Sequence, residues 1–311
     1  MEQQEFYNTP LNEPQNPEPS EAEYNDMPTE PKKNSPKKHH GFRNFLIFMA
    51  VIVLVWWFNN FTLRTSEYKV YSDEIVQPFR IAVLSDYHAT EYGIDNDDIT
   101  EEINEADPDL VFMLGDMYSR RDGWDRIQIH IDLVAQLTKQ GHTVYFVPGE
   151  HDTSERYLSE VAAAGAHVMS YKGEIINVKG NNVQILGIDN VYYSPTFDLN
   201  NAFSLAENCF TILMAHIPYY QAFAEFGADL TICGDTHGGI IQLPFDRGPA
   251  YYSRTGEWLP ELTGNRSDVY DKGMFPYKGG SMFITSGIGG YPVPARFNNR
   301  PEIAVIDIEP Y

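Results

Sequence analysis

The sequence is poor in cysteine and in basic residues, and it has no Gly/Ser-rich linker. Two cysteines in 311 residues are too few for a disulfide scaffold or a thiolate zinc site. Lysine and arginine total 22 against 44 aspartates and glutamates, which gives a formal net charge of −22. Such a surface repels phosphate backbones, which argues against nucleic acid as a partner. Without a linker or an internal repeat, we expect one folded domain after the N-terminal region.

The first 44 residues combine a polar stretch with a basic cluster. Residues 1–31 are rich in Pro, Glu, Asn and Gln and have almost nothing to bury, which is typical of a disordered tail. The basic cluster that follows consists of Lys32, Lys33, Lys37, Lys38 and Arg43. We therefore expect residues 1–44 to be a disordered tail that carries positive charge at its end.

Residues 45–58 read FLIFMAVIVLVWWF, a run without a single polar side chain. Extended through residue 63, the run would form about 28 Å of helix, against a hydrocarbon core of about 30 Å. A buried core helix is disfavoured because the run has no polar face. A cleaved signal peptide is disfavoured because FNNFTLRTSEYK offers no small-residue cleavage site. A transmembrane signal anchor over residues 45–63 is the prediction that remains.

The position of the basic cluster predicts the orientation of this span. By the positive-inside rule, the N-terminus is cytoplasmic, and residues 64–311 lie outside a single-pass cell-membrane protein. The first 44 residues hold eight of the acidic and five of the basic residues, and the span holds none. Residues 64–311 therefore carry 36 acidic and 17 basic residues, a net charge of −19.

Short apolar runs alternate with amphipathic stretches throughout residues 64–311. Continuous apolar runs are typical of strands that are buried on both faces, and these runs are 80–85, 110–114, 143–147, 210–215, 230–233, 282–285 and 303–308. Helical spacing or helix-end signals mark 97–106, 124–140 and 154–164. A further pair of strands, 174–178 and 183–188, flanks a turn and reads as a hairpin. The pattern predicts an α/β fold with mixed strand pairing.

Potential metal ligands follow five of these strands, directly where each strand ends. In chain order they are Asp86 and His88, then Asp116, then Glu150 with His151 and Asp152, then His216, and finally Asp235 with His237. In open α/β sheets the carboxyl ends of the strands form the ligand crevice. One strand-end aspartate is usually a helix cap or a turn residue, but five such strand ends together predict a metal site.

These blocks resemble the calcineurin-like metallophosphoesterase superfamily. Its pattern is D-x-H, G-D, G-N-H-D or G-N-H-E, a lone H and G-H-x-H, and the order and spacing are intact over residues 80–240. The turn at residues 287–290 and the segment 296–303 resemble a bacterial, membrane-anchored subgroup. The resemblance implies a four-layer α/β/β/α sandwich of two mixed sheets, and phosphoester hydrolysis at a two-metal centre.

The resemblance also implies a role for each block. Asp116 matches the carboxylate that bridges the two metals. The other matching ligands are Asp86, His88 and His237 for the first metal and His216 for the second. His151 matches the histidine that protonates the leaving oxygen, a task for which a pKa near 6.5 is suited. Asp152 would orient that imidazole or stabilise its charge, and it also reads as the N-cap of the helix that follows.

Two residues depart from the family pattern, and both belong to the second metal. Glu150 stands where the family has Asn, and Asp235 stands where it has His. The site therefore has four carboxylates where the family pattern has two, and their four negative charges would cancel the charge of two divalent ions. Oxygen ligands favour Mn²⁺ or Mg²⁺ over Zn²⁺, so we expect two divalent ions with Mn²⁺ favoured, while Mg²⁺, Fe²⁺ and Zn²⁺ stay open. Both replacements can bind metal, which favours an altered second site over a lost one.

The substrate is less constrained by the sequence. A long aromatic loop from residue 245 to residue 281 suggests Tyr251 and Arg254 as substrate-binding residues, and Arg296 could clamp a phosphate. Packing of the loop on the sheet and ion pairs for the arginine are the alternatives. The expected function is a membrane-anchored phosphoesterase acting on a phosphorylated small molecule or lipid. A weak or inactive member that binds a phosphorylated envelope ligand and a metal-stabilised structural protein are the alternatives.

Overall fold

The structure, a computed structural model, describes residues 40–89, 93–189, 198–245, 247–263, 269–290 and 294–311. Residues 1–39 of the predicted tail lie outside the described residues. The first element is helix α1 (His40–Phe61), and its segment Gly41–Phe61 is long and apolar enough to cross a membrane. The side chains of residues 41–58 are exposed. The helix begins a few residues before the predicted span and ends two residues before the predicted end.

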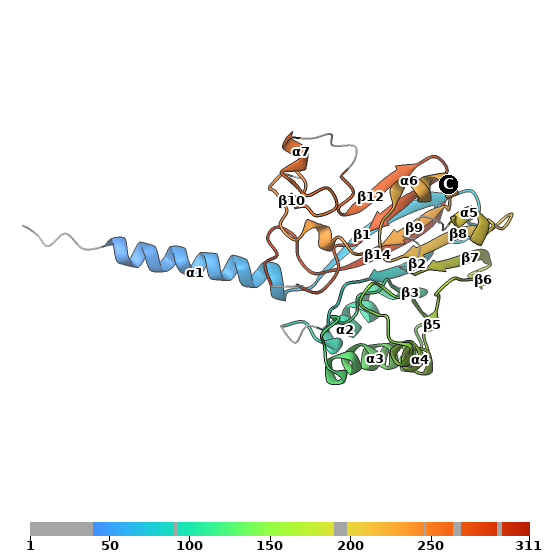
Figure 1. Cartoon of the computed structure of the whole chain (residues 1–311), viewed down its shortest axis with the longest axis horizontal. Helices are drawn as coiled ribbons and strands as arrows, with labels where there is room; N and C mark the ends of the chain where they lie inside the picture. The colour runs from blue at the N-terminus through green and yellow to red at the C-terminus, as the bar shows by residue number, and fades with distance from the viewer. Residues whose placement is uncertain (1–39, 90–92, 190–197, 246, 264–268, 291–293) are drawn as a thin grey trace, which may run out of the picture. The chain divides into compact units, whose positions relative to one another are not determined.

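Two six-stranded mixed sheets form the domain that follows (Figure 1). The first sheet has the order β1 (Arg64–Ser72), β14 (Glu302–Pro310), β2 (Phe79–Leu84), β3 (Leu110–Met113), β4 (Val144–Phe146) and β5 (His167–Val168). The second has the order β12 (Gly273–Tyr277), β13 (Gly280–Ile284), β9 (Leu230–Cys233), β8 (Phe210–Ala215), β7 (Asn181–Ile188) and β6 (Lys172–Val178). A separate two-stranded ribbon joins β10 (Tyr251–Tyr252) to β11 (Glu257–Trp258).

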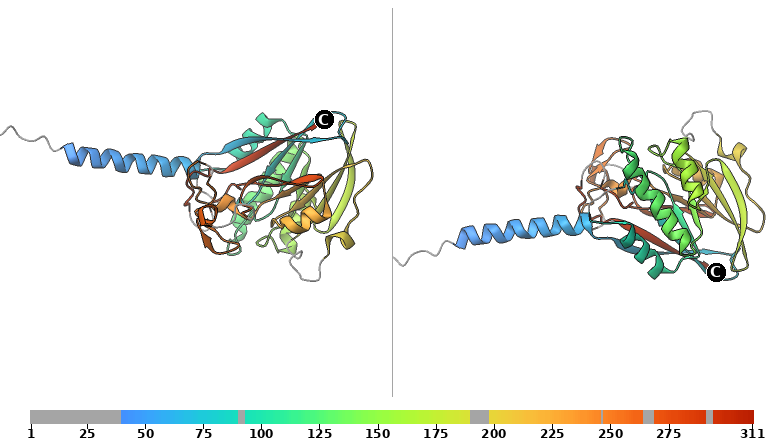
Figure 2. Two further views of the ribbon diagram at one scale, coloured as in Figure 1. Left: turned by 90° about the horizontal axis from the view of Figure 1, so that it is seen from above. Right: turned by 90° about the horizontal axis from the view of Figure 1, so that it is seen from below.

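Helices cover the outer face of each sheet, as Figures 1 and 2 show. The helices of the first sheet are α2 (Asn96–Ala106), α3 (Trp124–Lys139) and α4 (Glu155–Ala163), and those of the second are α5 (Leu199–Ala202) and α6 (Tyr220–Phe226). Two short helices, η3 (His237–Gly239) and α7 (Pro260–Thr263), lie in the connection between β9 and β12.

The alternation of side chains along each strand explains the layers. On β2, Ile81 packs into the core between the sheets, whereas its neighbour Ala82 packs against the helices of the first sheet. On β8, Ile212 packs into the same central core, whereas Leu213 packs against Phe223 of α6. Both faces of these strands are therefore buried, which is why the sequence reads as continuous apolar runs. The predicted four-layer α/β/β/α sandwich is confirmed.

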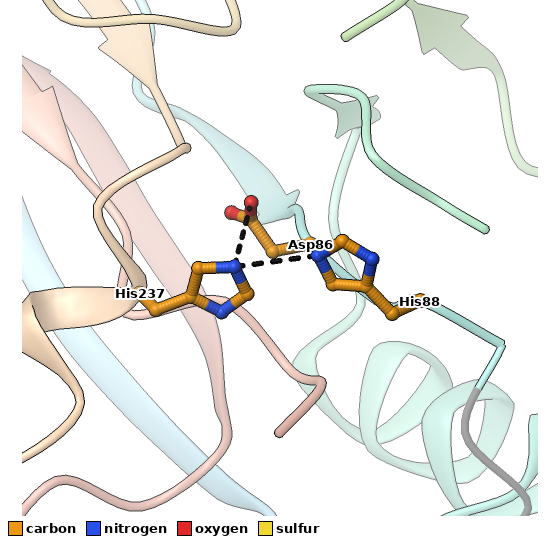
Figure 3. Close-up of side chains that lie close together, drawn as sticks. All are labelled: Asp86, His88 and His237. Atoms are coloured by element: carbon orange, nitrogen blue, oxygen red, sulfur yellow. Dashed lines mark hydrogen bonds and ion pairs between the residues drawn. The ribbon is translucent and has the colours of Figure 1, made fainter. Parts of the chain in front are cut away.

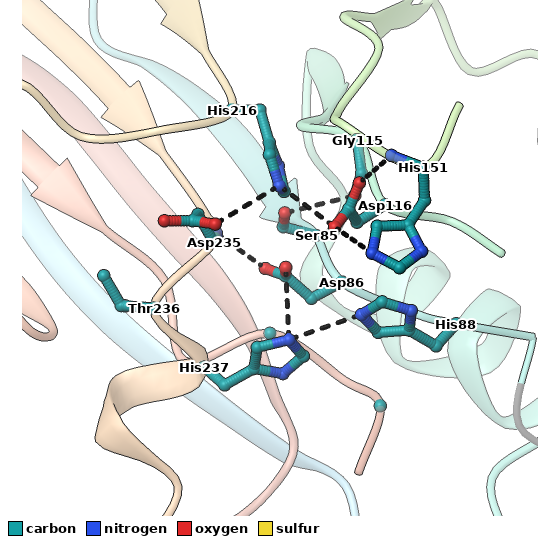
Figure 4. Close-up of polar contacts among 12 residues, drawn as sticks. Ser85, Asp86, His88, Gly115, Asp116, His151, His216, Asp235, Thr236 and His237 are labelled. Carbon is teal, nitrogen blue, oxygen red and sulfur yellow. Dashed lines mark hydrogen bonds and ion pairs between the residues drawn. The ribbon is translucent and has the colours of Figure 1, made fainter. Parts of the chain in front are cut away.

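Strand register brings the ligand-bearing loops to one end of the sandwich. β2, β3 and β4 are parallel neighbours, with Leu84 opposite Met113 and Met113 opposite Phe146. In the second sheet β8 and β9 are parallel neighbours, with Met214 opposite Ile232. Because these strands end at nearly the same level, the loops that follow them meet, as Figure 4 shows.

Several elements were not predicted. β1 follows α1 after only two residues and forms an edge strand parallel to β14, although its sequence RTSEYKVYS is mostly polar. β12 pairs with β13 as a hairpin, and α6 is a helix of only seven residues. The predicted hairpin is confirmed, because β6 and β7 pair antiparallel around a turn at Lys179 and Gly180, both of which have positive φ.

Candidate metal centre

Asp86, His88 and His237 form the first of three clusters of potential ligands (Figure 3). The Nε2 atom of His237 lies 3.3 Å from Nε2 of His88 and 3.5 Å from Oδ1 of Asp86. Burial, reinforced by the neighbouring imidazole, lowers the pKa of His88 to about 3, and burial also lowers the pKa of His237 to about 3. Both rings are therefore neutral at pH 7 and have a lone pair available for a metal.

Asp86 also indicates that this cluster suits a cation. Its side chain is fully buried, and Oδ2 accepts a hydrogen bond from the Asp235 backbone N–H at 3.1 Å. Oδ1 is buried without a hydrogen-bond partner among the described residues. An unpaired buried carboxylate oxygen is costly, and a metal ion would satisfy it. The residues present therefore fit the metal that the sequence pattern implies.

The second cluster is formed by Asp86, Asp116 and His216, with Asp235 beside them (Figure 4). The Nδ1 atom of His216 is 2.6 Å from the Leu114 carbonyl oxygen, which accepts its proton. The Nε2 atom therefore faces the carboxylates, 3.3 Å from Asp116 Oδ2 and 3.9 Å from Asp235 Oδ1. The hydrogen bond to Leu114 holds the His216 ring with Nε2 toward the carboxylates, which is the orientation that a metal ligand needs.

Electrostatics at this second cluster favour a positive charge. Burial opposes protonation of His216, but the carboxylates of Asp116, Asp86 and Asp235 outweigh it and raise the pKa of His216 well above its usual value. Burial also raises the pKa of Asp235, to about 6. A divalent ion would balance the negative charge of these carboxylates. Its binding would displace the proton on His216.

Asp116, Glu150 and His151 form the third cluster. His151 Nδ1 lies 2.8 Å from the backbone nitrogen of Arg120, and because a backbone N–H can only donate, Nδ1 accepts. In the neutral ring the proton is therefore on Nε2, which lies 3.8 Å from Asp116 Oδ2 and 3.5 Å from Glu150 Oε1. The Glu150 side chain is 49% exposed and lies at the rim of the cluster.

Asp152 has backbone partners that the sequence does not predict. Its buried carboxylate accepts backbone N–H groups from Asp116 at 2.5 Å, Gly149 at 3.0 Å and Met117 at 3.2 Å. It does not cap the following helix, because the side chain of Ser154 does so. Asp152 instead ties the loop after β3 to the loop after β4, and so holds Asp116 and His151 in register.

The backbone of the site is strained at several of the predicted ligands. Five of the predicted ligands have positive φ: Asp86, His88, Asp116, Asp235 and His237. Each such conformation costs roughly 1–3 kcal/mol for a residue other than glycine, and such residues gather at functional sites. Close packing adds to the constraint, because a Cβ on Gly149 would lie only 2.3 Å from Asp116 Oδ1.

None of the three predicted substrate residues is a member of these clusters. Arg296 is buried, and its guanidinium donates to the backbone carbonyls of Ser286, Gly287 and Gly289. This arrangement argues against the phosphate-binding role predicted for it. Tyr251 is exposed on β10, and Arg254 donates to the Pro218 carbonyl. Their substrate roles stay predictions.

A pocket of about 630 Å³ beside the clusters contains residues that the sequence analysis missed. Its wall includes His88, Glu150 and His151, and also Arg120, Arg121 and Arg126. The sequence does carry a signal for these arginines, because three basic residues fall within seven positions directly after the Asp116 block of an acidic domain.

The chain is similar to known phosphoesterases over this whole region. Residues 79–239, which include all of the predicted ligands, match the model of the family described as calcineurin-like phosphoesterase. The chain is 26% identical over 259 residues to the uncharacterized metallophosphoesterase YkuE of Bacillus subtilis (strain 168), covering 79% of this chain and 86% of YkuE. It is 23% identical over 246 residues to the phosphodiesterase YaeI of Escherichia coli (strain K12), covering 74% and 82%. Among solved structures, the NAD nucleotidase NadN of Haemophilus influenzae aligns with a TM-score of 0.47 at 16% identity, over 68% of this chain and 45% of NadN.

Proposed function

Because the chain belongs to the calcineurin-like phosphoesterase family, we propose that it is a membrane-anchored phosphoesterase that uses two divalent metal ions to hydrolyse a phosphomonoester or a phosphodiester. The observation that supports two ions is the sharing of carboxylates. Asp86 belongs to both the His88–His237 cluster and the His216 cluster, and Asp116 belongs to both the His216 cluster and the His151 cluster. Shared carboxylates are what a pair of adjacent ions requires.

The donors favour hard cations. Asp86, His88 and His237 would hold the first ion, and His216 with Asp116 and Asp235 would hold the second. Because carboxylates outnumber imidazoles around His216, Mn²⁺ or Mg²⁺ suits this site better than Zn²⁺, and we propose Mn²⁺. Ions bound here would supply Lewis acidity toward the phosphoryl oxygens. Glu150 is a further proposed ligand of the second ion.

His151 is the proposed general acid. Its neutral ring carries the proton on Nε2, which faces the carboxylate shared by two of the clusters. In hydrolysis a water oxygen bonds to phosphorus and the bond from phosphorus to the leaving oxygen breaks. As an imidazolium, His151 would pass its Nε2 proton to that leaving oxygen and return to the neutral ring, while the attacking water releases a proton to the solvent; the products are an alcohol and a phosphate or phosphomonoester. The Arg120 backbone N–H directs Nε2 toward the site in the neutral ring, and it must release Nδ1 when the ring takes up its second proton.

The anchor is proposed from α1 and the residues before it. The helix is long and apolar enough to span a bilayer, and the basic cluster precedes it in the sequence. We propose that residues 45–63 act as a signal anchor, that residues 1–44 form a cytoplasmic tail, and that residues 64–311 form the external domain. Protease added to intact cells should degrade the domain and spare the tail. The reverse pattern would overturn the orientation.

A catalytically weak member that binds a phosphorylated envelope ligand is the second candidate. It is favoured by the position of Glu150, whose half-exposed carboxylate lies near His151 and outside the His216 cluster. A second ion that lacked this ligand would be bound less tightly, and catalysis would suffer before ligand binding did.

Hydrolysis of a chromogenic substrate separates the two candidates. The full chain in detergent is stripped with EDTA, and turnover of bis(p-nitrophenyl) phosphate and of p-nitrophenyl phosphate is followed as Mn²⁺ is added back. We expect metal-dependent turnover that Asp116→Ala abolishes. Asp132→Ala is the matched control because Asp132 is an exposed residue of α3, and it should retain the wild-type rate. No turnover of either substrate at saturating Mn²⁺ would favour the binding protein.

A further inference from the structure

The last residues of α1 form part of the pocket wall beside the metal-ligand clusters. Asn60 and Phe61 line it together with His88 and His151. Because α1 is the proposed membrane span, the pocket adjoins the point where the chain would leave the bilayer. In Figures 1 and 2 the C-terminal end of α1 lies beside the loops around β10.

This end of α1 is fixed to the domain by specific contacts. The Asn60 side chain donates to the Arg296 carbonyl at 3.0 Å and accepts from the Arg296 backbone N–H at 2.8 Å. Trp56 Nε1 donates to the Pro294 carbonyl at 2.8 Å, and the Arg300 guanidinium lies 4.5 Å from the centre of the Phe58 ring. With only two residues between α1 and β1, the pocket cannot move far from the end of the helix.

Exposed apolar side chains lie on the segments that adjoin the contacts of this helix end. Phe297 directly follows Arg296, the partner of Asn60, and forms a β-bridge with Ile241, and the two side chains are 45% and 40% exposed. Trp258, on the neighbouring ribbon, is 71% exposed. Aromatic residues beside a span are typical of the interface between bilayer and water, so these side chains suit contact with lipid.

The charge of the pocket contrasts with that of the domain. Residues 64–311 contain 17 basic residues for a net charge of −19, yet Arg120, Arg121 and Arg126 all line this one pocket. The acidic residues that share its wall are Asp122 and Glu150. Guanidinium groups bind phosphate oxygens in bidentate fashion, so the wall next to the metal-ligand clusters suits a second anionic group.

We propose that the pocket takes an anionic phospholipid from the membrane in which the protein is anchored. The phosphoester to be cleaved lies at the metal-ligand clusters, a second anionic group of the same lipid pairs with the three arginines, and the acyl chains leave past Phe61 into the bilayer. This inference rests on the proposed phosphoesterase function, and it adds the class of substrate. A water-soluble phosphate ester has no need of a pocket wall built from the anchor.

The test compares two ligands that share a headgroup and differ only in acyl chains. The full chain is reconstituted in phosphatidylcholine vesicles with Mn²⁺, and hydrolysis of bis(p-nitrophenyl) phosphate is measured. Cardiolipin in the vesicles and its fully deacylated counterpart in solution are then added at equal bulk concentration. Each carries two phosphodiester groups. We expect cardiolipin to inhibit at a concentration at least tenfold lower than the deacylated compound.

Variants and a second lipid test the arginines. Arg121→Gln combined with Arg126→Gln should raise the concentration of cardiolipin for half-inhibition at least fivefold, whereas Arg156→Gln, an exposed arginine of α4 outside the pocket, should leave it unchanged. Phosphatidylglycerol at the same surface charge should inhibit less than cardiolipin. Equal inhibition by the two lipids, or no effect of the double variant, would contradict the pairing of a second anionic group with the arginines.

The failures of the two proposals are distinguishable. If the wild-type chain hydrolyses the chromogenic substrate but the deacylated compound inhibits as strongly as cardiolipin, the substrate is a soluble phosphate ester and the lipid inference is wrong. If the wild-type chain hydrolyses no chromogenic substrate, the phosphoesterase proposal itself fails. Inhibition that follows the acyl chains and depends on the arginines supports both.

Discussion

Replacing Asp152 with alanine separates two roles that a buried acid beside a histidine can play. In the structure its carboxylate accepts three backbone N–H groups, from Asp116, Met117 and Gly149. Alanine would leave these groups without their acceptor. We therefore predict that Asp152→Ala destabilises the fold itself, before any effect on the His151 ring is considered.

The size of the effect follows from the hydrogen bonds. Each buried N–H left unpaired costs about 1–3 kcal/mol, so three would cost about 3–9 kcal/mol. The lower end applies for two reasons. Water can enter the space that the carboxylate leaves, and burial, followed by the charge of Asp116, raises the pKa of Asp152 to about 7, so part of its charge is already disfavoured. We expect a loss of about 3–4 kcal/mol, which for a domain of this size lowers the melting temperature by roughly 10 °C.

Thermal unfolding of the full chain in detergent, followed by circular dichroism, measures this loss. The samples are treated with EDTA so that altered metal binding does not contribute. Asp152→Asn retains one acceptor oxygen and should lose less, and Asp132→Ala should change the stability by no more than about 0.5 kcal/mol. An Asp152→Ala protein that melts with the wild type, but has a lower rate and a shifted pH profile, would refute the reasoning and return Asp152 to the role of orienting His151.

Three further predictions concern the backbone, a titrating carboxyl and the second metal. Gly149→Ala should lower the rate roughly a hundredfold in the chromogenic assay, since displacement of Asp116 by a fraction of an ångström upsets the site. Asp229 has a pKa raised to about 6, chiefly by burial. Its folded form therefore holds a proton more tightly than the unfolded chain, and stability is lost as pH rises from 4 through 6. The melting temperature of Asp229→Asn minus that of the wild type should therefore increase as pH rises over this range. A difference that stays constant with pH would contradict the assignment of the raised pKa to Asp229. Glu150→Asn combined with Asp235→His should keep activity and move the metal preference from Mn²⁺ toward Zn²⁺, and each single change should be worse than the pair.

The sequence predicts the central strands well and the edges poorly. A strand buried on both faces must be apolar at every position, as in residues 81–84, and such a run is visible without any knowledge of its neighbours. The edge strand β1 needs apolar contact on one face only, and alternation through Ser66, Tyr68 and Val70 is its only signal. Strand β12 could not be predicted because it contains Pro276. Proline in a sequence usually indicates the end of a strand, although an edge strand tolerates it.

The candidate site divides in the same way. Asp86, Asp116 and His216 can be identified because strand ends are recognisable and metal ligands at several of them are rarely accidental. The partners of Asp152 could not be predicted because they are backbone N–H groups of two loops, and side-chain identity carries no information about them. The contribution of Phe61 to the pocket depends on how α1 joins the domain, which no local pattern reports.

The central claim is that the strand-end residues form a dinuclear metal centre, and metal stoichiometry tests it most directly. The full chain is saturated with Mn²⁺ in detergent, desalted and assayed for metal by mass spectrometry. The account predicts two ions per chain in the wild type, one after His216→Ala, and fewer than one after Asp86→Asn, because Asp86 belongs to two clusters. A wild-type chain that retains no more than one ion at saturation, or an Asp86→Asn chain that retains two, would contradict it.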